Sequence, residues 1–238
     1  MFSDSDVTNY KELLLAFKEG GYEFVKFKDL NKPYGQIALR HDIDFDCEFA
    51  LTAAMEEKQL GIHSTFFFLL RSETYNLFSK KNSEFVKAIK EMGHSISLHF
   101  DPLIYDDFQS GFLEEKRLFE SFFNTEIDII SIHRPNEFFQ ELDEPIQGID
   151  HSYLSKYSKD IAYYADSRGE WRYGHPVNSE AFEQNKSMQI LTHPIWWEMD
   201  NPDKLEKLRD YYGLLKSRIR ANISENCIPF REIENDLD

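Results

Sequence analysis

Residues 36–44 read QIALRHDID, an apolar run that ends in a histidine and two aspartates. The segment QIALRH has the length and composition of a buried strand, and residues 46–60 carry apolar side chains at helical spacing. Strands with continuous apolar character are typical of a parallel sheet that is covered on its faces. The stretch therefore predicts a strand followed by a helix, with polar side chains where the strand ends.

The same alternation continues along the chain. Further strands are predicted at 22–27, 65–70, 94–99, 127–133, 161–166 and 187–193, and helices at 9–19, 83–92, 112–124 and from residue 201 onward. The last helix is expected to bury Leu205, Leu208, Tyr212, Leu215 and Ile219. No repeat or Pro/Gly/Ser-rich linker divides the sequence, so residues 1–238 are interpreted as one α/β domain of mostly parallel strands, open or closed into a barrel.

The composition excludes several classes of protein. The 238 residues include 43 acidic and 27 basic side chains, a formal charge of −16, which argues against a nucleic-acid partner. Cys47 and Cys227 lie far apart, so any metal must be held by histidine and carboxylate. We find neither a leader sequence nor the roughly 18 apolar residues of a transmembrane segment, and we expect a cytoplasmic protein.

Polar side chains follow the predicted strands at their carboxyl ends. They are His41, Asp42 and Asp44, then His99 and Asp101, then His133 and Arg134, then Asp166 and Arg168, and finally His193. Because the carboxyl ends of parallel strands in α/β barrels meet at one rim, we expect these groups to form one site.

The two aspartates of the first group are the first candidates for chemistry. Asp42 and Asp44 are two residues apart in an extended segment and so point the same way. Two adjacent carboxylates repel each other unless a cation or proton lies between them. The repulsion is removed if one aspartate binds a metal ion and the other acts as a base beside it. Alternatively, one caps the helix that begins near Asp46 and the other pairs with Arg40.

Two histidines are candidates for the remaining metal ligands. His99 and His133 would complete a set of two histidines and one carboxylate with Asp44, which leaves coordination positions open for water and substrate. The alternative is that both histidines are packed structural groups at the rim. Arg134 is expected to pair with Asp42 or Asp44.

The last strand predicts a proton donor. A histidine such as His193 can protonate a leaving amine when a carboxylate holds its other ring nitrogen, and Asp166 is the expected carboxylate. Trp196 and Trp197 follow directly. These tryptophans either stack on a sugar ring or belong to the core.

The order of the motifs IALRHDID, STFFFL, GHSISLH, HRP and LTHP resembles the NodB-like polysaccharide deacetylases of carbohydrate esterase family 4, over roughly residues 36–197. HDID is a variant of that family's paired aspartates. The resemblance implies a distorted (β/α) barrel and metal-dependent removal of N-acyl groups from amino sugars.

The resemblance also implies roles for single residues. Asp42 matches the catalytic base, Arg134 the arginine that orients it, and Asp44 and His99 two of the metal ligands. His193 matches the catalytic acid and Asp166 the carboxylate that tunes it. Leu103 stands where the family has its second metal histidine, so His133 or Asp101 must substitute, and we expect His133 from its place at a strand end.

The predicted protein is therefore a hydrolase that uses a divalent ion, zinc, to remove an acetyl or formyl group from an amino sugar. Arg168 and Arg172 are expected to bind an anionic group of the substrate, with Trp196 and Trp197 beside the sugar. That substrate would be a small or carrier-linked N-acylated sugar used in surface polysaccharide synthesis. Two alternatives remain: a hydrolase of small non-sugar amides, and an inactive barrel that binds a glycan or a partner, which Leu103 favours.

Overall fold

Eight strands form one parallel sheet in the computed structural model, which describes residues 2–233. Along the sheet the order is β6 (Asp150–His151), β5 (Ile129–Ile132), β4 (Ser95–Phe100), β3 (Thr65–Phe68), β2 (Gln36–Ile43), β8 (Met188–Thr192) and β7 (Ala162–Ala165), with β1 (Glu23–Phe24) beside the start of β2. Every pairing between these strands is parallel. The sheet is a half-barrel of the distorted (β/α) type, as predicted.

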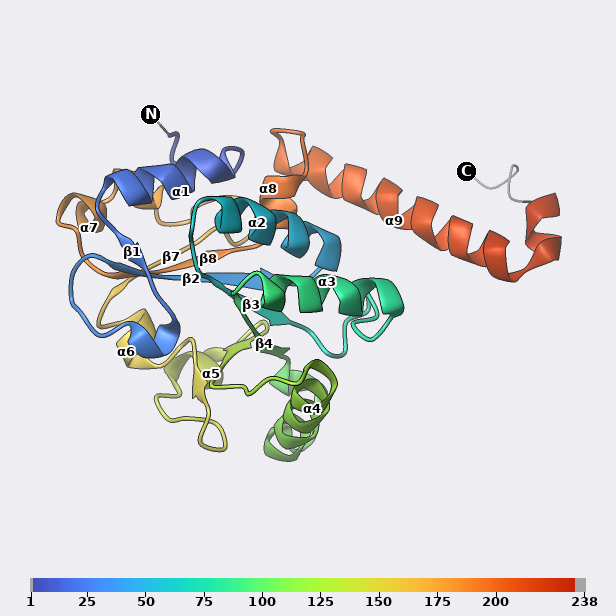
Figure 1. Cartoon of the computed structure of the whole chain (residues 1–238), viewed down its shortest axis with the longest axis horizontal. Coiled ribbons are helices and arrows are strands. Elements are labelled where there is room, and N and C mark those ends of the chain that lie inside the picture. Colours follow the sequence, from blue (N-terminus) through green and yellow to red (C-terminus); the bar gives the residue numbers. More distant parts are fainter. Residues whose placement is uncertain (1, 234–238) are drawn as a thin grey trace. The chain divides into compact units, whose positions relative to one another are not determined.

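Helices precede, connect and follow the strands along the chain. They are α1 (Tyr10–Glu19), α2 (Cys47–Gln59), α3 (Lys80–Glu91), α4 (Phe108–Phe123), α5 (Glu137–Glu141), α6 (Ser155–Ser158), α7 (Glu180–Glu183), α8 (Ile195–Glu198) and α9 (Lys204–Asn226). Figure 1 shows α1, α2 and α3 along one side of the sheet. By its internal contacts the chain divides after Glu198 into two units, and the sheet lies wholly in the first. A single domain over residues 1–238 stays a prediction.

The central strand β2 is buried on both faces along its whole length. Ala38 packs in a core cluster with Phe67 and Ile129 of neighbouring strands. Because side chains alternate along a strand, Arg40 and Asp42 share that inner face. His41, between them, points the opposite way, toward Glu57 of α2, and so does not join the other strand-end groups as expected. The inner face is therefore apolar at the start of β2 and polar at its end.

A buried polar cluster fixes α2 to the outer face of the sheet. Glu57 is fully buried, and its carboxylate lies 2.6 Å from His41 Nε2 and 3.4 Å from His94 Nδ1. The hydroxyls of Tyr10 and Ser64 donate hydrogen bonds to the same carboxylate. Burial alone would raise the pKa of Glu57, but His41 and His94 hold it below its usual value, so the carboxylate is ionised in the folded protein.

Most predicted elements are present with shifted ends, and a few are wrong. The strand expected at 36–41 runs on to Ile43, so Asp42 lies within β2, while the strand expected at 22–27 is reduced to the two residues of β1. Strand β6 was not predicted, because two residues carry no periodicity. The described helices include none long and apolar enough to cross a membrane.

The last helix, α9, has the predicted spacing without the predicted burial. Leu205, Leu208, Tyr212 and Ile219 are exposed. Helical periodicity identifies an apolar stripe on a helix, but it does not identify what packs against that stripe.

Candidate active site

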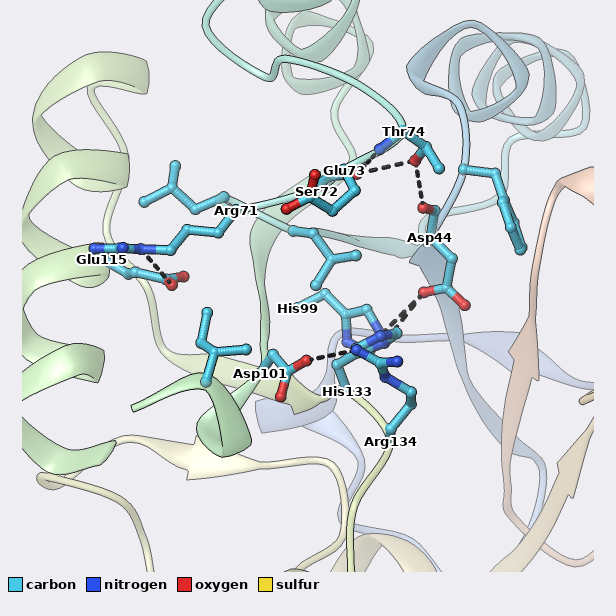
Figure 2. Close-up of a pocket in the computed structure, with 14 residues that line it drawn as sticks. Asp44, Arg71, Ser72, Glu73, Thr74, His99, Asp101, Glu115, His133 and Arg134 are labelled. Atoms are coloured by element: carbon cyan, nitrogen blue, oxygen red, sulfur yellow. Dashed lines mark hydrogen bonds and ion pairs between the residues drawn. The ribbon is translucent and has the colours of Figure 1, made fainter. Parts of the chain in front are cut away.

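Three predicted metal ligands converge at the carboxyl ends of β2, β4 and β5. Asp44 Oδ1 lies 3.1 Å from His99 Nε2 and 3.5 Å from His133 Nδ1, and the two ring nitrogens are 2.9 Å apart. Figure 2 shows the three side chains pointing toward one another. Together they form the one group of this kind in the described part of the chain whose ligand atoms lie mutually within reach of a single ion.

This triangle fits a small divalent cation. Ligands of a tetrahedral zinc ion with bonds of about 2.0 Å lie about 3.3 Å from one another, close to the three separations in the structure. Burial alone would raise the pKa of Asp44, but the adjacent His133 and His99 hold it well below its usual value, so the carboxylate is ionised. Two imidazoles and one carboxylate make a donor set suited to zinc.

Local structure explains why these three groups meet. Asp44 directly follows β2, and the hydroxyl of Thr74 donates to its backbone carbonyl over 2.9 Å (Figure 2). His99 pairs in register with Ser131 of β5. The amide of His133 donates to the carbonyl of Phe100, which continues the ladder past the end of β5.

Asp101, the alternative third ligand, has another role. Its carboxylate accepts from the amide of Leu103 and from Arg134 Nη2, over 3.1 and 3.0 Å. In Figure 2 it lies on the far side of His99 from Asp44. The described residues therefore place His133, and not Asp101, with Asp44 and His99.

Of the two arginines considered as partners of the paired aspartates, Arg40 holds Asp42 and Arg134 does not. Arg40 donates through Nε and Nη2 to the two carboxylate oxygens of Asp42, over 2.9 and 2.6 Å, and both side chains are buried. Arg134 instead pairs with Asp101 and is 73% exposed. The expected pairing of Arg134 with Asp42 or Asp44 is wrong, because Arg40 shares the inner face of β2 with Asp42 and reaches it from two residues away.

Burial alone would raise the pKa of Asp42, but the guanidinium of Arg40 and the ring of His99 lower it below its usual value. Asp42 Oδ2 is 3.7 Å from His99 Nε2. An ionised carboxylate thus lies beside the three candidate ligand atoms.

The predicted acid and its carboxylate partner are in contact. His193 Nδ1 lies 2.6 Å from Asp166 Oδ1, and the other ring nitrogen, Nε2, faces the metal ligands at 3.9 Å from Asp44 Oδ2. Burial alone would lower the pKa of His193, but Asp166 and then Asp44 raise it to about 9. Asp166 is itself fully buried and also accepts from the indole of Trp197 over 2.7 Å.

Two clefts open beside the metal ligands and share Asp44, His99 and His133 in their walls. The larger, about 660 Å³, is also lined by Asp42, His193, Arg168, Arg172 and Trp196. Trp197 does not line it and packs against Tyr10 and Trp171. Of the paired tryptophans, Trp196 therefore lies at the cleft. Trp197 does not have the predicted substrate-binding position; it lies in the core, where its indole donates to Asp166.

The smaller cleft, about 400 Å³, contains polar groups that the sequence did not single out. Glu115 of α4 is almost fully buried there, accepts from the hydroxyl of Tyr105 over 2.5 Å, and lies 3.7 Å from Arg71 (Figure 2). Burial raises the pKa of Glu115 to about 7. A glutamate in the middle of an amphipathic helix gives no sequence signal of this kind.

The pairing of Arg40 with Asp42 did have a signal, because residues i and i+2 of a strand share a face. No sequence signal predicted that the hydroxyl of Ser131 in β5 contacts Arg40, Asp42 and His99.

No protein-family model and no curated protein matches the sequence. Among solved structures, the chain is similar to a family 4 pseudoenzyme from Bacillus anthracis, with 16% identity, 79% of this chain and 62% of that one covered, and a TM-score of 0.41. It is also similar to a family 4 acetyl xylan esterase from Clostridium thermocellum in complex with cobalt (15%, 76% and 84%, TM-score 0.37) and to a peptidoglycan deacetylase from Bacillus subtilis (11%, 83% and 96%, TM-score 0.45). The first two of these structures are described as members of family 4, the carbohydrate esterase family that the sequence motifs resemble.

Proposed function

We propose that this protein is a metal-dependent hydrolase that removes an acetyl or formyl group from the nitrogen of an amino sugar. The observation that carries the proposal is the grouping of three ligand atoms, from Asp44, His99 and His133, with a separate carboxylate and a separate histidine at the same cleft. Amide hydrolysis needs these components: a polarised carbonyl, a base for water and an acid for the leaving amine.

Asp44, His99 and His133 would hold the ion. A bound zinc ion polarises the amide carbonyl and increases the acidity of water. Asp42, fixed by two hydrogen bonds from Arg40, takes a proton from the attacking water. His193 gives a proton from Nε2 to the departing nitrogen, while Asp166 holds its Nδ1.

Residues of the larger cleft support a sugar that carries a negative charge. Arg168 and Arg172 both line this cleft, and guanidinium groups bind phosphate or carboxylate through paired hydrogen bonds. Trp196 also lines this cleft, where its indole would contact the sugar. We propose a small or carrier-linked N-acylated sugar, a precursor of surface polysaccharide, as the substrate.

The proposal is tested by release of acetate or formate from a panel of N-acylated sugars, sugar phosphates and non-sugar amides. We expect the wild type to turn over acylated sugars. Chelation of the metal, or the variant Asp44→Asn, should lower this turnover at least about 100-fold. Adding zinc to the chelated wild type should restore its activity. If only non-sugar amides are turned over, the protein is an amide hydrolase whose substrate is not a sugar. Full activity after chelation, or no turnover of any compound by protein loaded with zinc, would refute the proposal.

A further inference from the structure

A buried serine joins the two functional parts of the site. Ser131 of β5 is fully buried on the inner face of the sheet, opposite β2. Its hydroxyl oxygen lies 2.5 Å from Arg40 Nη2, 3.0 Å from Asp42 Oδ2 and 2.9 Å from His99 Nδ1. One hydroxyl therefore contacts the proposed base, the arginine that holds it and a proposed metal ligand.

The chemistry of these neighbours fixes which way each hydrogen bond runs. A serine hydroxyl has one proton to donate and two lone pairs that accept. The guanidinium of Arg40 can only donate, so one lone pair of Ser131 accepts from it. The ionised carboxylate of Asp42 can only accept, so it receives the proton of Ser131. The remaining lone pair must accept from the ring of His99.

This assignment determines the tautomer of His99. If Nδ1 of His99 carries the proton given to Ser131, Nε2 has the free lone pair, and Nε2 is the atom that faces Asp44 at 3.1 Å. In the opposite arrangement Ser131 would donate to Nδ1 and the proton of His99 would sit on Nε2. Two lone pairs would then face each other between Ser131 and Asp42, and His99 could not bind a metal.

We propose that Ser131 is a positioning residue that holds His99 in its metal-binding tautomer and, with the same hydroxyl, holds Asp42 in place. The role rests on the proposed function, since it gives His99 and Asp42 the tasks described above. Partners that orient a metal-ligating histidine in this way typically change metal affinity 10–100-fold, roughly, when they are removed.

The test is the affinity of the full chain for zinc, measured by competition with a chromophoric chelator. We expect Ser131→Ala to bind zinc about 10–100-fold more weakly than wild type, with a lower kcat/KM even at saturating zinc. Ser131→Thr, which keeps the hydroxyl, should recover most of the affinity. The matched control is Ser97→Ala, which removes another buried hydroxyl of the inner face, one that donates to the carbonyl of Ile129 outside the site.

A Ser131→Ala protein that binds zinc as tightly as wild type, or Ser97→Ala weakening zinc binding equally, would overturn the proposal. A second measurement needs no variant: nitrogen NMR of the zinc-loaded wild type should show the proton of His99 on Nδ1 and zinc on Nε2, and zinc bound through Nδ1 would contradict the role of Ser131. Failure of the proposed function is distinct from both results, because wild type itself would then bind no zinc or release no acyl group.

Discussion

At the scale of single residues, the proposed acid and the proposed base of the site have opposite protonation states. Burial disfavours the charged form of both Asp42 and His193, but a charged neighbour outweighs burial in each case. Arg40 lowers the pKa of Asp42, and Asp166 raises the pKa of His193 to about 9. At neutral pH Asp42 is ionised and His193 carries a proton. These are the states that a general base and a general acid require before the reaction begins.

Removing the charge of Asp166 should move the pH profile. In Asp166→Asn the pKa of His193 falls toward its usual value, so the alkaline limb of kcat should shift to lower pH, and the rate at pH 8 should drop about 30-fold. Trp197→Phe is the control, because it removes the indole donor to Asp166 and keeps the carboxylate charge. An unchanged alkaline limb in Asp166→Asn, or an equal shift in Trp197→Phe, would contradict this assignment.

Two arginine–aspartate pairs at the site should differ widely in their effect on stability. Arg40→Ala leaves the buried carboxylate of Asp42 without its counter-charge, and we expect it to lower the free energy of unfolding by about 3–5 kcal/mol. Arg134→Ala removes an exposed arginine from Asp101, whose carboxylate keeps the hydrogen bond from the amide of Leu103, and should change the free energy of unfolding by less than about 1 kcal/mol. Urea unfolding of both variants measures the difference, and similar losses would show that Arg40 is not the buried partner of Asp42.

At the scale of helices and strands, periodicity predicted the long elements and missed contacts made through space. β2, α2 and α4 carry continuous apolar runs or helical spacing, and their positions were found to within a few residues. The pairing of Tyr105 with α4 had no such signal. The Cβ of an alanine at Gly111 would lie 2.4 Å from the ring of Tyr105, a clash that depends on a loop outside the helix.

That contact gives two helical glycines opposite expected outcomes. Gly111→Ala should lower the melting temperature despite the better helix propensity of alanine, because Tyr105 must move and loses its position against Glu115. Gly213→Ala in α9 has no atom within 4 Å of the new Cβ, and it should leave stability unchanged or raise it by up to about 1 kcal/mol. Thermal unfolding that ranks the two variants in the reverse order would refute the packing described for Tyr105.

A loop histidine should make stability depend on pH. His175, which begins the short 3-10 helix Pro176–Asn178, is almost fully buried, stacks on Phe2 and accepts a hydrogen bond from the amide of Val177. Burial lowers its pKa to about 4, against 6.5 in an unfolded chain. Between these values the unfolded chain binds a proton that the folded protein does not, so stability falls as the pH drops from about 6.5 to about 4.

We expect the free energy of unfolding to lose about 2 kcal/mol between pH 7 and pH 5 through His175 alone. His175→Gln should remove that part of the dependence, as measured by urea unfolding of both proteins at the two pH values. Parallel pH dependences in wild type and variant would show that His175 is not held neutral.

At the scale of the whole molecule, the sheet converts motifs spread over the sequence into one site. The three proposed metal ligands lie at strand ends that are spread over residues 44–133, and parallel pairing in the order β5-β4-β3-β2 brings those ends to one edge. The strand-end rule predicted this convergence from the sequence, together with Asp44, His99, His133 and the contact between His193 and Asp166.

The sequence could not predict which of several nearby residues contacts a given side chain. Residue spacing along β2 favours Arg40 as the partner of Asp42, but the sequence does not tell that Arg134 reaches Asp101 instead, or which of Trp196 and Trp197 lines the cleft. The hydroxyl of Ser131 joins groups from β2, β4 and β5, a relation that exists only once the sheet has formed.

The central claim is that Asp44, His99 and His133 bind one cation together. The most direct measurement is a crystal structure of the zinc-loaded protein with anomalous diffraction recorded at the zinc edge, alongside the metal content of the same preparation. We expect one zinc ion per chain, about 2 Å from Asp44 Oδ1, His99 Nε2 and His133 Nδ1. A folded protein that takes up no zinc, or an ion bound elsewhere while these three side chains hold only water, would contradict the claim.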